Sequence, residues 1–159
     1  MNLPNRKPTR LAKYDYSQNG YYFITICTHN KECILTKIVG EGLCALPSIK
    51  LMPIGEKVKE AIEFIDNHYN SVAVDKYVIM PNHIHLIIKI QMGGHGDPPL
   101  RIYDIIGRLK SFTTNEYGDI LWQRSFHDHI IRDEKDYLKI WEYIDNNPAK
   151  WLEDCYYDE

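Results

Sequence analysis

Two histidines separated by one apolar residue, His83 and His85, are the residues of this sequence best suited to chemistry. They open a run of aliphatic residues with the composition of a β-strand. Because side chains alternate between the faces of a strand, both imidazoles are expected on the same face. Neutral imidazole is a common ligand of divalent metals. The pair predicts part of a metal site, although an isolated pair of this kind is more often structural.

A second reactive group is predicted near the end of the last helix. Tyr143 lies on the flank of the apolar stripe of that helix, and Asn147 follows it by one turn on the same side. An amide oxygen is a hard ligand that suits Mg²⁺ or Mn²⁺, so Asn147 would join His83 and His85 around one ion. A phenol beside such an ion can attack a phosphate. The alternative for Tyr143 is amphipathic packing without a catalytic role.

Another histidine pair, His127 and His129, is a rival metal site. Asp128 between the two histidines and Arg132 shortly after them favour hydrogen bonding at the surface instead. The first pair therefore remains the better candidate.

The rest of the sequence predicts the elements that must position these groups. β-branched and aromatic residues indicate strands at 21–28, 71–80, 83–91 and 120–131, with one or two short strands within 32–54. Helical spacing of apolar residues indicates helices at 55–68, 100–117 and 133–147. This order fits an α+β, ferredoxin-like fold, in which an antiparallel sheet carries helices on one face. The last helix is extra to that core.

Length, composition and charge are those of a single domain spanning residues 1–159. The chain is 44% hydrophobic and 26% charged, which is ordinary for a protein with a real core. It contains no apolar run of membrane-spanning length and no secretory signal, and its four cysteines show no C-x-x-C spacing. These features predict a cytoplasmic protein with free thiols and no membrane partner. Glycine and proline predict a flexible loop at 92–99.

The formal net charge of −3 means that any nucleic-acid site must be a local basic patch. Residues 1–20 form a basic N-terminal arm whose candidate phosphate contacts are Arg6, Lys7, Arg10 and Lys13. The alternative for this arm is a solvated, frayed terminus.

Five segments of the chain match, in the same order, the motifs of a known protein family. They are Tyr14-Asp15-Tyr16, Gly20-Tyr21-Tyr22-Phe23-Ile24-Thr25, Met80-Pro81-Asn82-His83-Ile84-His85, Trp122-Gln123-Arg124-Ser125-Phe126 and Tyr143-Ile144-Asp145-Asn146-Asn147-Pro148. The set resembles the single-tyrosine HUH transposases of the insertion-sequence 200/605 group, and within them the REP-associated tyrosine transposases. The insertion-sequence enzymes more often have Gln where Asn147 stands, whereas Asn before Pro148 fits the REP-associated branch.

The resemblance implies the HUH endonuclease fold and a specific reaction. By position, Tyr143 matches the nucleophile, and His83, His85 and Asn147 match the ligands of Mg²⁺ or Mn²⁺. Family members bind single-stranded DNA with hairpins, either REP-like or at insertion-sequence ends. Their tyrosine attacks a phosphodiester, which forms a 5′-phosphotyrosine and frees a 3′-hydroxyl that later rejoins. Such a transposase is expected in the cytoplasm, associated with the nucleoid.

In an acidic chain, phosphate contacts would be local. Besides the arm, the candidates are Arg108, Lys110, Arg124 and Arg132. Many relatives are homodimers that exchange the tyrosine helix, whereas some act as monomers, and the sequence does not choose between them.

Two other functions also stay open. One is a domesticated, non-catalytic protein that binds hairpin DNA or RNA, and the other is a metal hydrolase that uses an activated water and no tyrosine.

Overall fold

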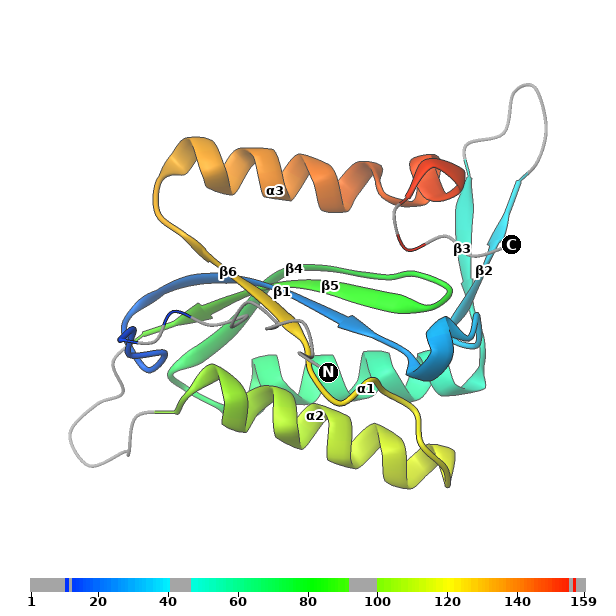
Figure 1. Cartoon of the computed structure of the whole chain (residues 1–159), viewed down its shortest axis with the longest axis horizontal. Coiled ribbons are helices and arrows are strands. Elements are labelled where there is room, and N and C mark those ends of the chain that lie inside the picture. The colour runs from blue at the N-terminus through cyan, green and yellow to red at the C-terminus, as the bar shows by residue number, and fades with distance from the viewer. Residues whose placement is uncertain (1–10, 12, 41–46, 92–99, 155, 157–159) are drawn as a thin grey trace, which may run out of the picture.

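A computed structural model of the chain describes residues 11, 13–40, 47–91, 100–154 and 156. A four-stranded antiparallel sheet lies at its centre, with helices on both sides (Figure 1). The elements are β1 (Gly20–Cys27), η1 (His29–Lys31), β2 (Thr36–Val39), β3 (Ser48–Leu51), α1 (Pro53–His68), β4 (Val72–Ile79), β5 (His83–Ile90), α2 (Ile102–Tyr117), β6 (His127–Ile131), α3 (Glu134–Asn146) and η2 (Pro148–Glu153). The predicted α+β antiparallel fold is confirmed.

The strand order β4-β5-β1-β6 places the histidine strand, β5, in the middle of the sheet. β5 pairs with β1 over eight residues, from Gly20 opposite Ile90 to Cys27 opposite His83. Both central strands are rich in apolar residues on both faces because helices cover both faces. This position gives the histidines a backbone that is hydrogen-bonded on both sides.

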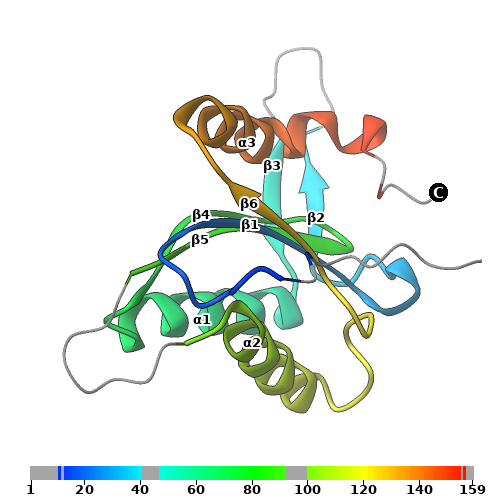
Figure 2. The same cartoon turned by 60° about the vertical axis from the view of Figure 1, so that its left-hand side comes forward.

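The sheet separates two apolar cores, and the side chains of β5 alternate between them as predicted. Ile84, Leu86 and Ile88 pack in the larger core against α1 and α2. Ile87 belongs to the smaller core, which contains Ile140 of α3. Figure 2 shows α1 and α2 below the sheet and α3 above it. The histidines of β5 therefore lie on the α3 side.

The predicted strand over residues 120–131 is wrong in its first half. Only the segment that forms β6 pairs with β1, and Trp122 makes no more than an isolated bridge. In the intervening loop, Lys110 Nζ donates to the carbonyl oxygens of Gln123 and Ser125 at 2.8 and 3.0 Å. A side chain of α2 thus satisfies backbone groups that a strand ladder would otherwise pair.

The short strands predicted between residues 32 and 54 are present and form a two-stranded sheet of their own, β2 and β3. This hairpin connects to α1 at a point of close backbone approach. A β-carbon at Gly55 would lie 2.0 Å from the carbonyl oxygen of Leu35, so only glycine fits there. No helix within the described ranges is both long and apolar enough to cross a bilayer.

Candidate metal centre and nucleophile

His83 is fully buried at the start of β5, and its neighbours determine which ring nitrogen carries the proton. Its Nδ1 lies 2.8 Å from Oδ1 of Asn82, and Nδ2 of Asn82 donates to the carbonyl oxygen of Tyr156. Because an amide oxygen can only accept, Nδ1 of His83 must be the donor. The lone pair is then on Nε2, which is buried and has no hydrogen-bond partner among the described residues.

His85 is oriented by the neighbouring strand, β1. Thr25 faces it in the sheet register, and its Oγ1 lies 2.8 Å from Nδ1 of His85. Phe23 stacks on the imidazole with the ring centroids 5.2 Å apart. On the other side of the ring, Nε2 of His85 lies 3.4 Å from Oη of Tyr143, the predicted nucleophile. Tyr143 and His85 of the same chain therefore lie side by side.

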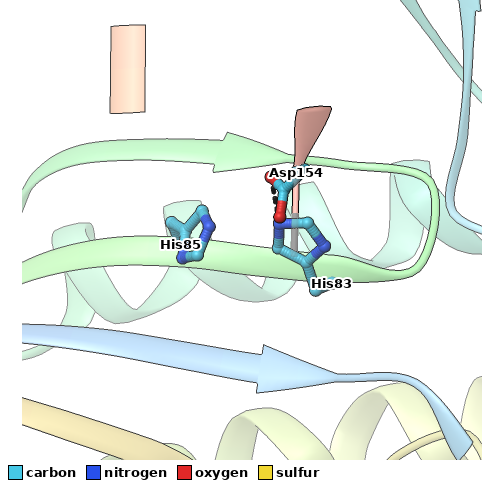
Figure 3. A group of neighbouring side chains, drawn as sticks. All are labelled: His83, His85 and Asp154. Atoms are coloured by element: carbon cyan, nitrogen blue, oxygen red, sulfur yellow. Dashed lines mark ion pairs between the residues drawn. The ribbon is translucent and has the colours of Figure 1, made fainter. Parts of the chain in front are cut away.

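A carboxylate that no sequence motif indicated lies beside the two histidines. Asp154 follows η2, its side chain is 3% exposed, and its Oδ2 lies 3.8 Å from Nε2 of His83 (Figure 3). Ligand atoms of His83, His85 and Asp154 all lie within 4.8 Å of one another. Across the described ranges, no other three side chains drawn from His, Cys, Asp and Glu form such a group. Two imidazoles and a carboxylate are a suitable donor set for a divalent cation.

Asn147, the predicted amide ligand, is the C-cap residue of α3. It is 3% exposed, and in the described part of the chain its Oδ1 has no hydrogen-bond partner. A buried acceptor left unpaired costs roughly 1–3 kcal/mol, which a bound cation would offset. Asn147, Asp154 and Tyr143 line one cleft of about 440 Å³. The residues present therefore fit a divalent metal with nitrogen and oxygen ligands.

Burial keeps both histidines neutral at physiological pH. It lowers the pKa of His83 from 6.5 to about 4, an effect that the nearby carboxylate of Asp154 partly offsets. Burial, together with His83, lowers the pKa of His85 to about 2. Neutral imidazole is the form that binds metals. The site is thus ready to bind a cation near pH 7 without releasing protons from these two rings.

The metal-free protein is expected to lose stability as the pH falls below about 6.5. Unfolded histidines take up protons in this range, whereas the folded rings of His83 and His85 resist protonation until pH 4 or lower. The free energy of unfolding should fall by roughly 1.4 kcal/mol per pH unit for each histidine. Urea unfolding in a chelator between pH 4.5 and 7 measures this slope. His83→Gln should reduce it and exposed His68→Gln should not; equal slopes in both variants would contradict the assignment.

The rival pair is not part of a comparable group. His127 and His129 are both exposed on β6, and Nε2 of His129 lies 2.7 Å from Oδ2 of Asp136 on α3. The contact is a surface hydrogen bond, as the neighbouring residues indicated. It ties the start of α3 to the sheet.

The predicted phosphate contacts are dispersed. Arg6, Lys7 and Arg10 lie outside the described residues, as does the predicted loop at 92–99. Lys13, Arg124 and Arg132 are exposed. Arg108 and Lys110 belong to α2, on the face of the sheet opposite the histidines; Arg108 donates to Oη of Tyr69, and Lys110 donates to loop carbonyls. The structure therefore does not bring Arg108 and Lys110 together with the histidine site.

The chain shares its fold with a transposase of known structure. The chain superposes on the structure of a REP-associated tyrosine transposase bound to a REP hairpin with a TM-score of 0.65 and 22% identity, over 89% of this chain and 74% of that one. A Haemophilus influenzae protein of no assigned function is 39% identical over 98% of this chain and 94% of its own length. A second H. influenzae protein, provisionally named a REP-associated tyrosine transposase, is 28% identical over 86% of this chain and 74% of its own.

No protein-family model matches the chain. The sequence relatives and the shared fold nevertheless agree with the ordered motifs, and the chain is similar to REP-associated tyrosine transposases in both sequence and fold.

Proposed function

We propose that the protein is a metal-dependent single-stranded DNA endonuclease and strand-transferase that acts beside a DNA hairpin. The observation that carries this proposal is the position of Tyr143 Oη, 3.4 Å from Nε2 of buried His85. Tyr143 itself is 42% exposed and lines an open cleft through which a DNA strand would approach its side chain. A nucleophile open to solvent beside buried metal-type ligands is the arrangement that phosphodiester attack requires.

In the proposed reaction, Oη of Tyr143 forms a bond to phosphorus while the bond from phosphorus to the 3′-oxygen breaks. The products are a 5′-phosphotyrosine and a free 3′-hydroxyl. The phenol proton passes to water, and the departing oxygen takes up a proton in turn. Rejoining is the reverse step, in which a 3′-hydroxyl attacks the phosphotyrosine and Tyr143 is released. Each step exchanges one phosphate ester for another, so the phosphate ester is retained and is not hydrolysed.

His83, His85 and Asn147 are proposed to hold Mg²⁺ or Mn²⁺, with Asp154 as a further ligand. A divalent ion bound there would polarise the scissile phosphate and offset the charge that develops on it. Nε2 of His83 and Oδ1 of Asn147 support this assignment because both are buried atoms without a partner among the described residues. Tyr143 and the ligands come from one chain, so a monomer can supply the whole site without exchange of helices.

The strand is proposed to lie along the cleft that opens at Tyr143. Lys139 lines this cleft one helical turn before Tyr143, and Lys150 lines it beyond Asn147. Neither lysine forms an ion pair with any described residue. Glu142, Glu153 and Asp154 also line the cleft, so these two lysines would supply its positive charge to a phosphate backbone.

Replacing Lys139 and Lys150 together by alanine is expected to weaken binding of hairpin-bearing single-stranded DNA about tenfold at 0.1 M salt. Each contact to a single-stranded phosphate contributes roughly 0.7 to the slope of log K against log salt, so the slope should fall by about 1.4. Fluorescence anisotropy over a salt series measures both quantities. Lys59→Ala on α1 is the control, and an unchanged slope in the double variant would place the strand elsewhere.

A covalent adduct is the direct test of the function. Incubation with labelled hairpin-bearing strands and Mg²⁺ or Mn²⁺ should give a protein–DNA species that survives a denaturing gel. A strand of scrambled sequence without a hairpin is the control. If hairpins bind equally well with and without metal and no metal supports cleavage, the protein is instead a non-catalytic hairpin-binding protein.

A further inference from the structure

Helix α3 carries Tyr143, but only two of its own residues, Ile140 and Ile144, are buried. Both lie in the smaller apolar core above the sheet. A helix seated on two aliphatic side chains is free to roll about its axis unless other contacts prevent it. Such a roll would move Tyr143 relative to His85. The contacts on the flanks of α3 therefore decide where the hydroxyl lies.

Strand β4 faces one flank of α3, and it contains a bulge at Asp75. Val74 pairs with Ile88 and Lys76 pairs with the adjacent Ile87, so Asp75 has no partner on β5. Cross-strand partners share a face, which places Lys76 on the α3 side together with Ile87. In a regular strand, consecutive side chains point to opposite faces. Because of the bulge, the adjacent side chains of Asp75 and Lys76 both face α3.

These two side chains contact one stripe of α3, and we call the five residues involved the β4 clamp. Asp75 accepts a hydrogen bond from Oη of Tyr137 near the start of the helix. Lys76 Nζ lies 2.7 Å from Oδ1 of Asp145 and 3.5 Å from the centroid of the Trp141 ring. Because Tyr137, Trp141 and Asp145 are four residues apart, they lie one above another. The clamp therefore holds both ends of the helix.

Tyr143 lies on the other flank of the helix. It is two residues from Trp141, which corresponds to about 200° around the axis. On that flank, Asp136 of α3 bonds to His129 of the opposite edge strand, β6, at 2.7 Å. A roll of α3 in either direction would break one of these sets of contacts. The helix is thus fixed from both edges of the sheet.

We propose that the β4 clamp sets the position of the nucleophile. Lys76 holds Asp145 and Trp141, which fixes the roll of α3 at which Tyr143 Oη meets Nε2 of His85. The proposal rests on the proposed function, because it takes Tyr143 to be the attacking group. Lys76 touches neither His85 nor the cleft residues and is a positioning residue. Its side chain is 21% exposed, so its contacts are partly shielded from solvent.

Lys76→Met tests the proposal, since it keeps the aliphatic stem and removes the charge that reaches Asp145 and Trp141. With hairpin DNA and metal both saturating, the rate constant of adduct formation should fall at least about tenfold, while the Kd for DNA changes less than about twofold. Lys76→Arg keeps the charge and should restore the rate to within about threefold of wild type. Lys59→Met, which breaks the exposed ion pair with Glu63 on α1, is the matched control and should change neither value.

Hydrogen–deuterium exchange gives a second readout that needs no catalysis. Amides of α3 should exchange faster in Lys76→Met than in the wild type, whereas those of β1 and β5 should not change. An unchanged rate of adduct formation in Lys76→Met overturns the positioning role. So does a fall in this rate that is matched by an equal fall in DNA affinity. Either result leaves the proposed function standing. A wild-type chain that forms no adduct, with α3 exchange still responding to Lys76→Met, removes the proposed function and with it the positioning role.

Discussion

Replacing Tyr143 by phenylalanine is expected to abolish the covalent protein–DNA adduct and to leave hairpin binding within about twofold of the wild type. The substitution removes only the oxygen that would attack phosphorus. The ring that packs 5.2 Å from His85 and 6.1 Å from Phe23 is retained. Because the lost hydroxyl belongs to a side chain that is 42% exposed, folding should be little affected. Loss of a nucleophile should lower the rate more than roughly a thousandfold.

A labelled strand on a denaturing gel measures the adduct, and anisotropy on the same strand measures binding. Tyr117→Phe at the end of α2 is the matched control, because it makes the same chemical change on the other side of the sheet. Wild-type adduct formation by the Tyr143 variant would show that another residue attacks. Full strand cleavage without any adduct would point to an activated water and a metal hydrolase.

The second large effect is expected from His85→Ala, which should abolish metal binding at the site and DNA cleavage together. His85 is 1% exposed and its orientation is held by Thr25 and Phe23, so no neighbouring side chain can replace its nitrogen. The affinity for Mn²⁺ should fall at least about a hundredfold, because loss of a direct ligand should cost more than the roughly 10–100-fold that follows loss of a residue that only orients a ligand. Isothermal titration with Mn²⁺ measures this change, and a tenfold increase in metal should not rescue cleavage.

Exposed His68→Ala is the control for this substitution. Asn147→Ala and Asp154→Asn then test the two oxygen ligands separately, and each is expected to weaken Mn²⁺ binding at least about tenfold. An Asp154→Asn variant with wild-type affinity would exclude this carboxylate from the ligand set. Mn²⁺ binding by His85→Ala at wild-type affinity would refute the assignment of the metal centre itself.

The parts of the site that lie on regular elements could be predicted from the sequence. Alternation along a strand is enough to place His83 and His85 on one face and the aliphatic residues between and after them on the other. Helical spacing is enough to place Tyr143 on the flank of α3 with Asn147 one turn further on. Both inferences need only the period of one element, and that period follows directly from the order of residue types.

The parts that depend on tertiary contacts could not be predicted in this way. Asp154 lies in a segment without periodicity, and only the path of the chain after α3 brings it to His83. The bulge at Asp75 is invisible in the sequence because the residues around it still read as a strand. From the sequence, Lys110 is a candidate phosphate contact, but in the structure its ammonium group donates to loop carbonyls. These hydrogen bonds stand where the apolar residues of this region predicted a strand.

The contacts of Tyr156 with Asn82 and His83 have a practical consequence. The carbonyl oxygen of Tyr156 accepts a hydrogen bond from Nδ2 of Asn82, and the Tyr156 ring lies 4.5 Å from that of His83. A tag or fusion partner joined directly after Tyr156 would therefore begin next to the proposed ligands. A polyhistidine tail attached there would add competing imidazoles beside them, so affinity tags for preparing this protein belong at the opposite end of the polypeptide.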